Sequence, residues 1–327
     1  MLEHPPEPMP PIHLGLNAVI VAVTHEEPRV LVVRPGDGGE GLEALPFGPL
    51  DAARDRTLEL ALRGWVREQA GIEVGYVEQL YTFGDRHRDP RERLGGPRMI
   101  SVGYLSLVRE DKLAQPASAR WLDWYHFLPW EDWREGRPKA LQGGLDQQLA
   151  GWAAAAGDPT AAARRRERID IAFGLGGAPW DEYRVLDRYE LLYEAALVEE
   201  AWRDRGEDPP RDKAAPGRAA PGRAMAFDHR RILATAIGRL RGKLKYRPVV
   251  FELLPETFTL FQLQTTVEAL SGRRLHKQNF RRLVETAGLV EGTGQLSTGG
   301  SGRPAELFRF RREVRRERPT PGVGQRG

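Results

Sequence analysis

Residues 206–223 divide the chain into two parts, because no helix or strand can be expected to run through them. The stretch carries the pentapeptide AAPGR twice in tandem, at Ala214–Arg218 and Ala219–Arg223. Proline, glycine and small residues without hydrophobic periodicity are typical of a flexible, extended linker. The 327 residues are too many for one ordinary domain, and each side of the break can bury a core of its own. The sequence therefore predicts two folded domains.

Charge is distributed unevenly between the two parts. Residues 1–227 contain 29 Lys and Arg against 37 Asp and Glu, whereas residues 228–318 contain 19 against nine. A basic region behind an acidic one predicts a polyanionic partner, such as double-stranded DNA, for the C-terminal part alone. A solvated basic face is the alternative, and charge by itself does not choose between the two.

The cysteine content and the apolar runs bound the environment of the chain. There is no cysteine, which excludes disulfides and thiolate metal sites. The Pro-rich, acidic start lacks the pattern of a signal peptide, and no apolar run is long enough to span a membrane. We expect a cytoplasmic protein without a membrane partner.

Strand and helix patterns alternate in the N-terminal part. Leu14–Thr24 and Arg29–Val33 are β-branched runs around a polar turn, which predicts a hairpin of buried strands. Tyr76–Phe83 and Met99–Val108 are apolar on both faces, which favours central positions in a sheet. Thr57–Ala70 has the spacing of an amphipathic helix. This alternation predicts an α/β domain.

Tryptophan positions add two expectations about packing. Trp65 lies on the apolar face of the expected helix, so we expect it to pack inward. The segment Trp121–Trp133 holds four of the eight tryptophans. Such a cluster could stack on a nucleobase, but we favour packing, either in the core or between domains.

The stretch Leu45–Gly71, LPFGPLDAARDRTLELALRGWVREQAG, resembles a degenerate Nudix box. The Nudix pattern is Gly, five residues, Glu, seven residues, then Arg-Glu-U-x-Glu-Glu-x-Gly-U, where U is bulky and aliphatic. When the pattern is anchored on Gly71, the Arg and first Glu slots hold Gly64 and Trp65, and the paired acids become Glu68 and Gln69. Upstream, Gly48 is displaced and Arg56 stands where the other Glu belongs.

These replacements bear on catalysis. Diphosphate hydrolysis by a Nudix box needs several carboxylates to hold Mg²⁺ against the phosphates. The resemblance therefore implies a nucleotide pocket that has lost its chemistry, with no catalytic residue, no metal and no required cofactor. The alternative is a Nudix hydrolase that acts on ADP-ribose or a dinucleotide with substitute metal ligands.

An arginine-rich loop follows the strand Tyr76–Phe83. Residues 84–97 read GDRHRDPRERLGGP, which could form a lid over an anionic ligand, although a solvated loop is the more frequent explanation. Together with the degenerate box, this loop supplies the residues that we predict to bind a nucleotide effector: Phe47, Glu68, Gln69, Arg86, Arg88 and Arg91.

The C-terminal part has the pattern of a winged helix-turn-helix. A helix is expected over Asp228–Lys243, and a second begins with a capping-box pattern at Thr259 and ends before Ser271–Arg273. A third helix is expected over His276–Ala287. The glycine-rich tip at residues 292–302 and a returning strand at 305–310 predict the wing.

The third helix exposes residues suited to DNA. Basic and amide side chains near the start of a recognition helix can reach base edges and phosphates in the major groove, and a wing arginine can reach a phosphate. A winged helix used only for protein contacts is the alternative. The residues that we predict to bind DNA are Thr259, Lys277, Gln278, Asn279, Arg281, Arg282 and Arg303.

Nearly the whole chain resembles the Nudix-related transcriptional regulators of NAD metabolism, of the alphaproteobacterial type that represses NAD-biosynthesis genes. The resemblance is carried by the degenerate box, YTFGD at residues 81–85, LYEAALVEEA at 192–201, and KYRPVVFELLPETFTLFQLQ with KQNFRRLVETAGLVEGTG and GRPAELFRF. It implies a homodimeric repressor on a palindromic operator, with NAD, ADP-ribose or ATP as effector. It also implies an α/β fold, a Nudix-like α/β/α sandwich with a C-terminal winged helix-turn-helix domain.

The predicted organisation has six segments. They are a disordered lead at 1–12, a Nudix-like effector-sensing domain at 13–175, a connecting helix at 176–205, a flexible linker at 206–224, a winged helix-turn-helix domain at 225–318 and a tail at 319–327.

Overall fold

The computed structural model describes residues 11–35, 41–86, 89–109, 119–208, 222–297, 304–311 and 313. The expected tail, residues 1–10 of the expected lead and residues 209–221 of the expected linker lie outside these residues, as do Arg88 and Arg303. Within the described part of the chain, no helix is long and apolar enough to cross a membrane.

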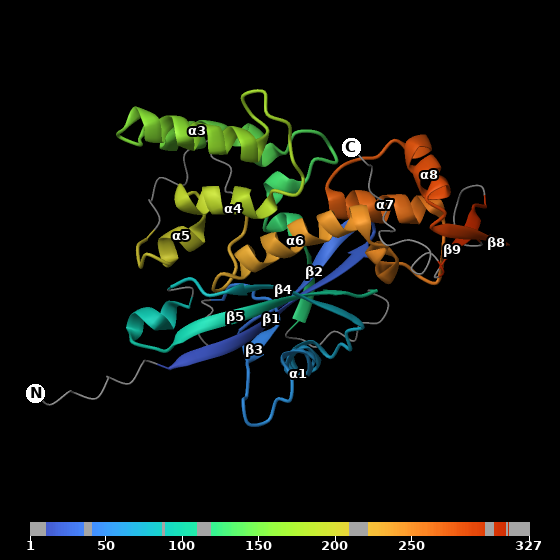
Figure 1. Ribbon diagram of the computed structural model, residues 1–327, viewed down its shortest axis with the longest axis horizontal. Helices are drawn as coiled ribbons and strands as arrows, with labels where there is room; N and C mark the ends of the chain where they lie inside the picture. The colour runs from blue at the N-terminus through green and yellow to red at the C-terminus, as the bar shows by residue number, and fades with distance from the viewer. Residues whose placement is uncertain are drawn as a thin grey trace, which may run out of the picture.

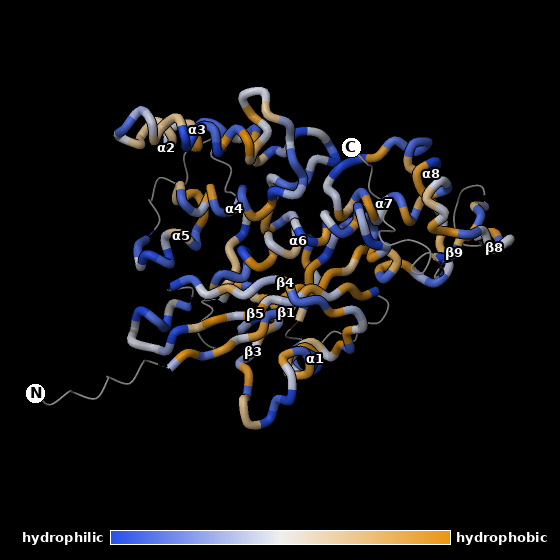
Figure 2. The backbone as a smooth tube through the Cα atoms, viewed as in Figure 1, coloured by the Kyte–Doolittle hydropathy of each residue, from blue (hydrophilic) through white to orange (hydrophobic). Residues whose placement is uncertain are grey.

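A mixed β-sheet forms the centre of the molecule (Figure 1). Its strand order is β4-β5-β1-β2-β6, and β3 pairs with β1. The hairpin β1–β2 turns at His25 and Glu26, both at positive φ, and β1 runs parallel to β5. Figure 2 shows hydrophobic stretches along both of these strands. The strands are β1 (Ile12–Thr24), β2 (Glu27–Val33), β3 (Phe47–Pro49), β4 (Tyr76–Phe83), β5 (Arg98–Leu107) and β6 (Ala119–Asp123).

The predicted hairpin and the other two strands are confirmed, but the central position expected for β4 is wrong. β4 lies at the edge of the sheet, beyond β5. Only one face of β4 is covered: Leu80 and Phe83 are buried, whereas Tyr81 is 63% exposed. A sequence apolar on both faces therefore did not specify a strand covered on both faces.

Alternation along β1 divides the core into two layers. Ala18 and Ile20 belong to the cluster that includes α1 (Leu58–Ala70). Val19 and Val21 point to the opposite face, where they join the cluster that includes α6 (His229–Tyr246). The helix α6 contacts β1, β4 and β5. The second helical layer of the sandwich is thus formed by a helix from beyond the linker.

Further helices pack outside α6 (Figure 1). The predicted connecting helix at 176–205 is wrong as a single element, because the chain turns at Ala196, where φ is 54°. The observed helices are α2 (Asp146–Ala154), α3 (Pro159–Phe173), α4 (Val185–Glu194) and α5 (Glu199–Arg203). Short 3-10 turns span Pro90–Leu94, Trp124–His126, Pro129–Glu131 and Val249–Leu253, and a π-helical turn spans Leu141–Leu145.

The C-terminal elements form the predicted winged helix. Thr259 caps α7 (Leu260–Ser271) in a capping box with Gln262, as the sequence predicted. Gly272 ends α7 at φ 71°, and the third helix, α8, spans Lys277–Thr286. The wing is a three-stranded sheet in the order β7-β9-β8, of which β7 was not predicted: β7 (Thr257–Phe258), β8 (Val290–Leu296) and β9 (Glu306–Phe310).

The tryptophan segment packs as expected. Trp124 and Trp130 are fully buried, and Trp133 lies against Trp180 with ring centroids 4.4 Å apart. The segment is core, which confirms packing over the alternative of base stacking.

Candidate functional site

A cavity of about 440 Å³ opens between the start of β1, β3, the Asp89–Met99 segment and the start of α6. Three rings form one wall: Phe47, Phe227 and His229 lie edge to face or tilted, with centroids 5.3–5.4 Å apart. Polar groups from Asn17 and Asp89 also line the cavity. Its size falls within the range of small-molecule sites, roughly 300–1,000 Å³.

The degenerate box positions Phe47. The side chain of Gln69 accepts a hydrogen bond from the Phe47 N–H at 3.0 Å and donates one to the Phe47 carbonyl at 2.7 Å. A carboxylate in the same place could accept the first bond but could not donate the second. Gln69 therefore holds the cavity wall from an acid position of the Nudix pattern.

Trp65 occupies another of the replaced acid positions and also has a structural role. Its indole N–H donates to the Pro49 carbonyl at 2.9 Å. The ring lies so close to Gly48 that a Cβ there would be 2.1 Å from it. Trp65 is half-buried over β3 and belongs to neither core cluster, so the predicted inward packing holds only as far as the contact with Gly48, where the ring leaves no room for a side chain.

One predicted arginine reaches the cavity. Arg91 lines it while pairing with the buried Asp89 at 2.6 Å, and this hydrogen bond raises the pKa of the Arg91 guanidinium above its ordinary value. Glu68 and Arg86 are exposed and do not line the cavity. Of the six predicted effector-binding residues, Phe47 and Arg91 line the cavity and Gln69 supports it from behind.

Sequence reasoning missed two parts of this cavity. Asn17 is a polar residue in the apolar run LGLNAVIVAV, and it is 2% exposed; a buried amide in a strand was the available signal. Phe227, Asp228 and His229 come from beyond the linker, where periodicity gives no sign that a segment will return to the first domain.

The residues of the box do not fit the Mg²⁺ that a Nudix fold implies. In the described ranges, no three His, Cys, Asp or Glu side chains gather where they could hold a metal ion. On α1 the carboxylate of Glu59 pairs with Arg63 at 2.8 Å. We therefore derive no metal-dependent step.

The helix α8 presents a polar face. Phe280 and Val284 are buried on its inner side. Thr259 differs from the other predicted DNA contacts, because its hydroxyl caps α7 by accepting from the Gln262 N–H. The remaining predicted contacts within the described residues are all exposed on α8: Lys277, Gln278, Asn279, Arg281 and Arg282.

Part of the basic charge of residues 228–318 is internal. Arg230 pairs with Glu200, Arg231 with Glu190 at 2.5 Å, and Arg241 with Glu131 at 2.6 Å. Arg230 and Arg241 are almost fully buried. The net positive charge of residues 228–318 is therefore larger than the charge that their surface presents to a partner. The exposed cations of α8 are stronger evidence for a polyanionic partner than this net charge.

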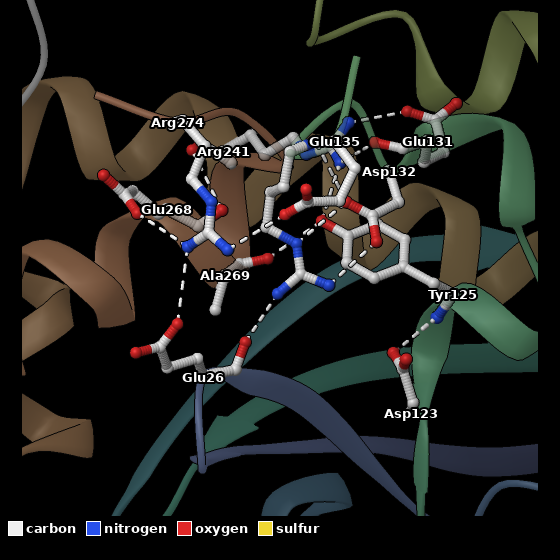
Figure 3. Close-up of polar contacts among 12 residues, drawn as sticks. Glu26, Asp123, Tyr125, Glu131, Asp132, Glu135, Arg241, Glu268, Ala269 and Arg274 are labelled. Atoms are coloured by element: carbon white, nitrogen blue, oxygen red, sulfur yellow. Dashed lines mark hydrogen bonds and ion pairs between the residues drawn. The ribbon is translucent and has the colours of Figure 1, made fainter. Parts of the chain in front are cut away.

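A buried polar cluster joins the turn before α8 to the first domain (Figure 3). Glu131 lies between Arg188 at 2.5 Å and Arg241 at 2.6 Å. Burial opposes its ionisation, but the two guanidinium groups hold the pKa of Glu131 below its ordinary value. The Tyr125 hydroxyl donates to the Ala269 carbonyl at 2.8 Å.

The same cluster fixes the end of α7. The Arg241 Nε donates to the Leu270 carbonyl at 3.1 Å, and the backbone N–H of Trp133 donates to the Gly272 carbonyl at 2.8 Å. Arg274 pairs with Glu268 at 3.1 Å. The α7–α8 turn is thus positioned by residues of the first domain and of α6.

The fold and the two sites define a class: a Nudix-like sandwich, with a nucleotide-sized cavity, joined to a winged helix-turn-helix domain. Residues 250–310 match the family described as the NrtR DNA-binding winged helix domain. Over 86 residues the chain is 42% identical to the "ADPR responsive transcriptional repressor NtrR" of Acinetobacter baylyi, a match that covers 26% of this chain and 34% of the relative. The chain therefore matches about a third of that relative's length.

Two solved structures share the fold over most of the chain. Shewanella oneidensis NrtR complexed with a 27mer DNA is 22% identical, covers 92% of this chain and 94% of its own, and has a TM-score of 0.53. A MutT/nudix family protein from Enterococcus faecalis is 15% identical, covers 95% of this chain and 90% of its own, and has a TM-score of 0.51. The chain therefore shares this fold, which confirms the fold class predicted from the sequence, and the match at residues 250–310 agrees with the resemblance.

Proposed function

We propose that this protein is a DNA-binding transcriptional repressor of NAD biosynthesis or salvage genes that senses a NAD-related nucleotide. The observation that carries the proposal is the exposed face of α8, with three cations and two amides on a winged helix. Side chains of these types read base edges and phosphates in the major groove. The match of residues 250–310 to a DNA-binding family supports the same reading.

The effector that we propose first is ADP-ribose, with NAD and ATP as the other candidates. The Acinetobacter relative is named as ADPR-responsive. The ring wall of the cavity suits an adenine, and the Arg91 guanidinium suits a diphosphate. The carboxylate of Asp89 suits ribose hydroxyls.

We infer that the effector is bound and not hydrolysed. Gln69 and Trp65 stand at acid positions of the Nudix pattern, and both make contacts that hold β3 in place. Binding needs the cavity wall that these contacts support, whereas hydrolysis needs the carboxylates that they replace.

A homodimer in the cytoplasm, with two recognition helices about one DNA turn apart, remains part of the proposal. Half-sites roughly 34 Å apart would then form a palindromic operator.

The test measures, by fluorescence anisotropy, the affinity of the full chain for promoter fragments of NAD-biosynthesis genes. This affinity is compared with the affinity for random DNA of equal length. We expect a preference for the promoter and a steep fall in affinity with salt, since each phosphate contact releases counterions. Equal affinity for promoter and random DNA would contradict the proposal.

A further inference from the structure

The side-chain amide of Asn17 is buried, and only one of its two polar atoms has a hydrogen-bond partner among the described residues. Its Nδ2 lies 2.8 Å from the His229 Nε2, and its Oδ1 has no partner in the described part of the chain. Asn17 is 2% exposed and lines the cavity. A buried polar atom without a partner is costly, so it calls for a partner that a ligand can supply.

The hydrogen bonds of His229 determine which way the Asn17 amide faces. The Leu45 N–H donates to the His229 Nδ1 at 2.9 Å, so Nδ1 is an acceptor and the neutral ring carries its proton on Nε2. The Nε2–H needs an acceptor, and Asn17 can offer only its carboxamide oxygen. With the oxygen toward His229, both ring nitrogens are satisfied. The Asn17 amino group is then the end without a partner in the described part of the chain, on a side chain that lines the cavity.

Hydrogen bonds hold the segment that precedes His229 against the first domain, and one residue of this segment has a strained backbone conformation. Phe227 has a φ of 53°, in the left-handed region that a bulky side chain rarely adopts. Arg203 holds it by donating to the Phe227 carbonyl and, at 2.8 Å, to the Met225 carbonyl. The Ala226 N–H donates to the Glu43 carbonyl at 2.8 Å. The segment just before α6, which forms part of the cavity wall, is thus held in a fixed position.

The helix α6 connects this wall to the DNA-binding turn. His229 is its first residue, and Arg241 is 12 residues later, which is about 18 Å along a helix axis. Arg241 contacts the Leu270 carbonyl and Glu131. One rigid element therefore touches the cavity at one end and the turn before α8 at the other.

We propose that Asn17 donates a hydrogen bond from its amino group to the bound nucleotide. His229 positions Asn17, and through His229 the binding of a nucleotide in the cavity changes the arrangement of α6 and the α7–α8 turn. This inference depends on the proposed function, because it names the contact through which the same cavity controls DNA binding. A ligand can change DNA affinity only by its unequal binding to the two arrangements of such an element.

Two variants test the two parts of the inference. Asn17→Asp keeps an acceptor for the His229 Nε2–H but replaces the ligand-facing donor with an acceptor. We expect the Kd for ADP-ribose, measured by calorimetry on the full chain, to rise at least about tenfold. His229→Phe keeps a ring against Phe47 and Phe227 but removes both nitrogens.

For His229→Phe the informative readout is the ratio of operator Kd values with saturating ADP-ribose and without it. We expect this ratio to fall from at least about fivefold in the parent protein to near one. The matched control is His126→Phe, the same substitution at an exposed histidine outside the cavity, which should keep the parental ratio.

The outcomes separate the inference from the proposed function. An unchanged ADP-ribose Kd in Asn17→Asp, or a parental ratio in His229→Phe, overturns the inference and leaves the sensor function in place. Should His229→Phe fail to fold, the Asn17→Asp result decides alone. If ADP-ribose, NAD and ATP all leave the operator affinity of the parent protein unchanged, the proposed function and the inference are both contradicted.

Discussion

Replacing Arg241 with methionine tests whether the buried cluster positions the recognition helix. The substitution keeps the volume of the aliphatic stem but removes the ion pair with Glu131 and the hydrogen bonds to the Leu270 and Glu131 carbonyls. Breaking a buried ion pair costs about 3–5 kcal/mol when one charge is left alone. Because Glu131 keeps Arg188, we expect the lower end, about 3 kcal/mol, and a thermal midpoint lower by roughly 6 °C.

Arg188→Met is the matched control. Arg188 is equally buried and pairs with the same carboxylate, but its other hydrogen bonds go to Ala172 and Asp181 and not to α7. We expect both variants to lose similar stability by thermal unfolding. Only Arg241→Met should weaken operator binding, by about tenfold, or 1.4 kcal/mol, in fluorescence anisotropy well below the midpoint. Equal losses of DNA affinity in the two variants would refute the positioning argument.

Three further predictions follow from the described contacts. Arg281→Ala with Arg282→Ala should abolish operator binding in a gel-shift assay while calorimetric nucleotide affinity stays unchanged; intact DNA binding would show that α8 is the wrong helix. Trp65→Glu with Gln69→Glu should not yield ADP-ribose hydrolysis with Mg²⁺, because both parent side chains hold β3; robust release of AMP and ribose 5-phosphate would contradict this. Since the folded pKa of Glu131 lies below its ordinary value, its stabilising contribution is complete above pH of about 4.5 and is lost as pH falls through the folded pKa. The gap in urea midpoint between the parent protein and Glu131→Gln should therefore shrink on acidification, and a constant gap would refute it.

Local patterns predicted most of the elements. Alternation and β-branching specified β1, β2 and β5, and the capping box at Thr259 specified the start of α7. Each of these signals acts between residues close in sequence, so the chain itself displays it. The short strand β7 gives no such signal, because two residues carry no periodicity.

The arrangement of the elements was less accessible. The helix expected over Asp228–Lys243 is present as α6, but it buries Ile232 and Ile237 against the sheet of the first domain. A hydrophobic stripe specifies that a face is covered and not by what. The linker favoured two separate domains, whereas the chain beyond it supplies one layer of the sandwich.

The cavity shows the same division. Phe47 and Arg91 were found through the resemblance to a Nudix box and a basic loop. Asn17 and His229 come together from positions 212 residues apart, and only tertiary structure places them in contact. The replaced acids at 65 and 69 were informative, since each residue now supports the wall of the cavity.

The most direct test of a nucleotide-controlled repressor is the affinity of the full chain for a promoter fragment, measured while ADP-ribose is titrated. We predict at least about a fivefold change in operator affinity, half complete near the Kd that calorimetry gives for ADP-ribose. An operator affinity that stays constant up to saturating ADP-ribose, NAD and ATP would contradict the proposed function.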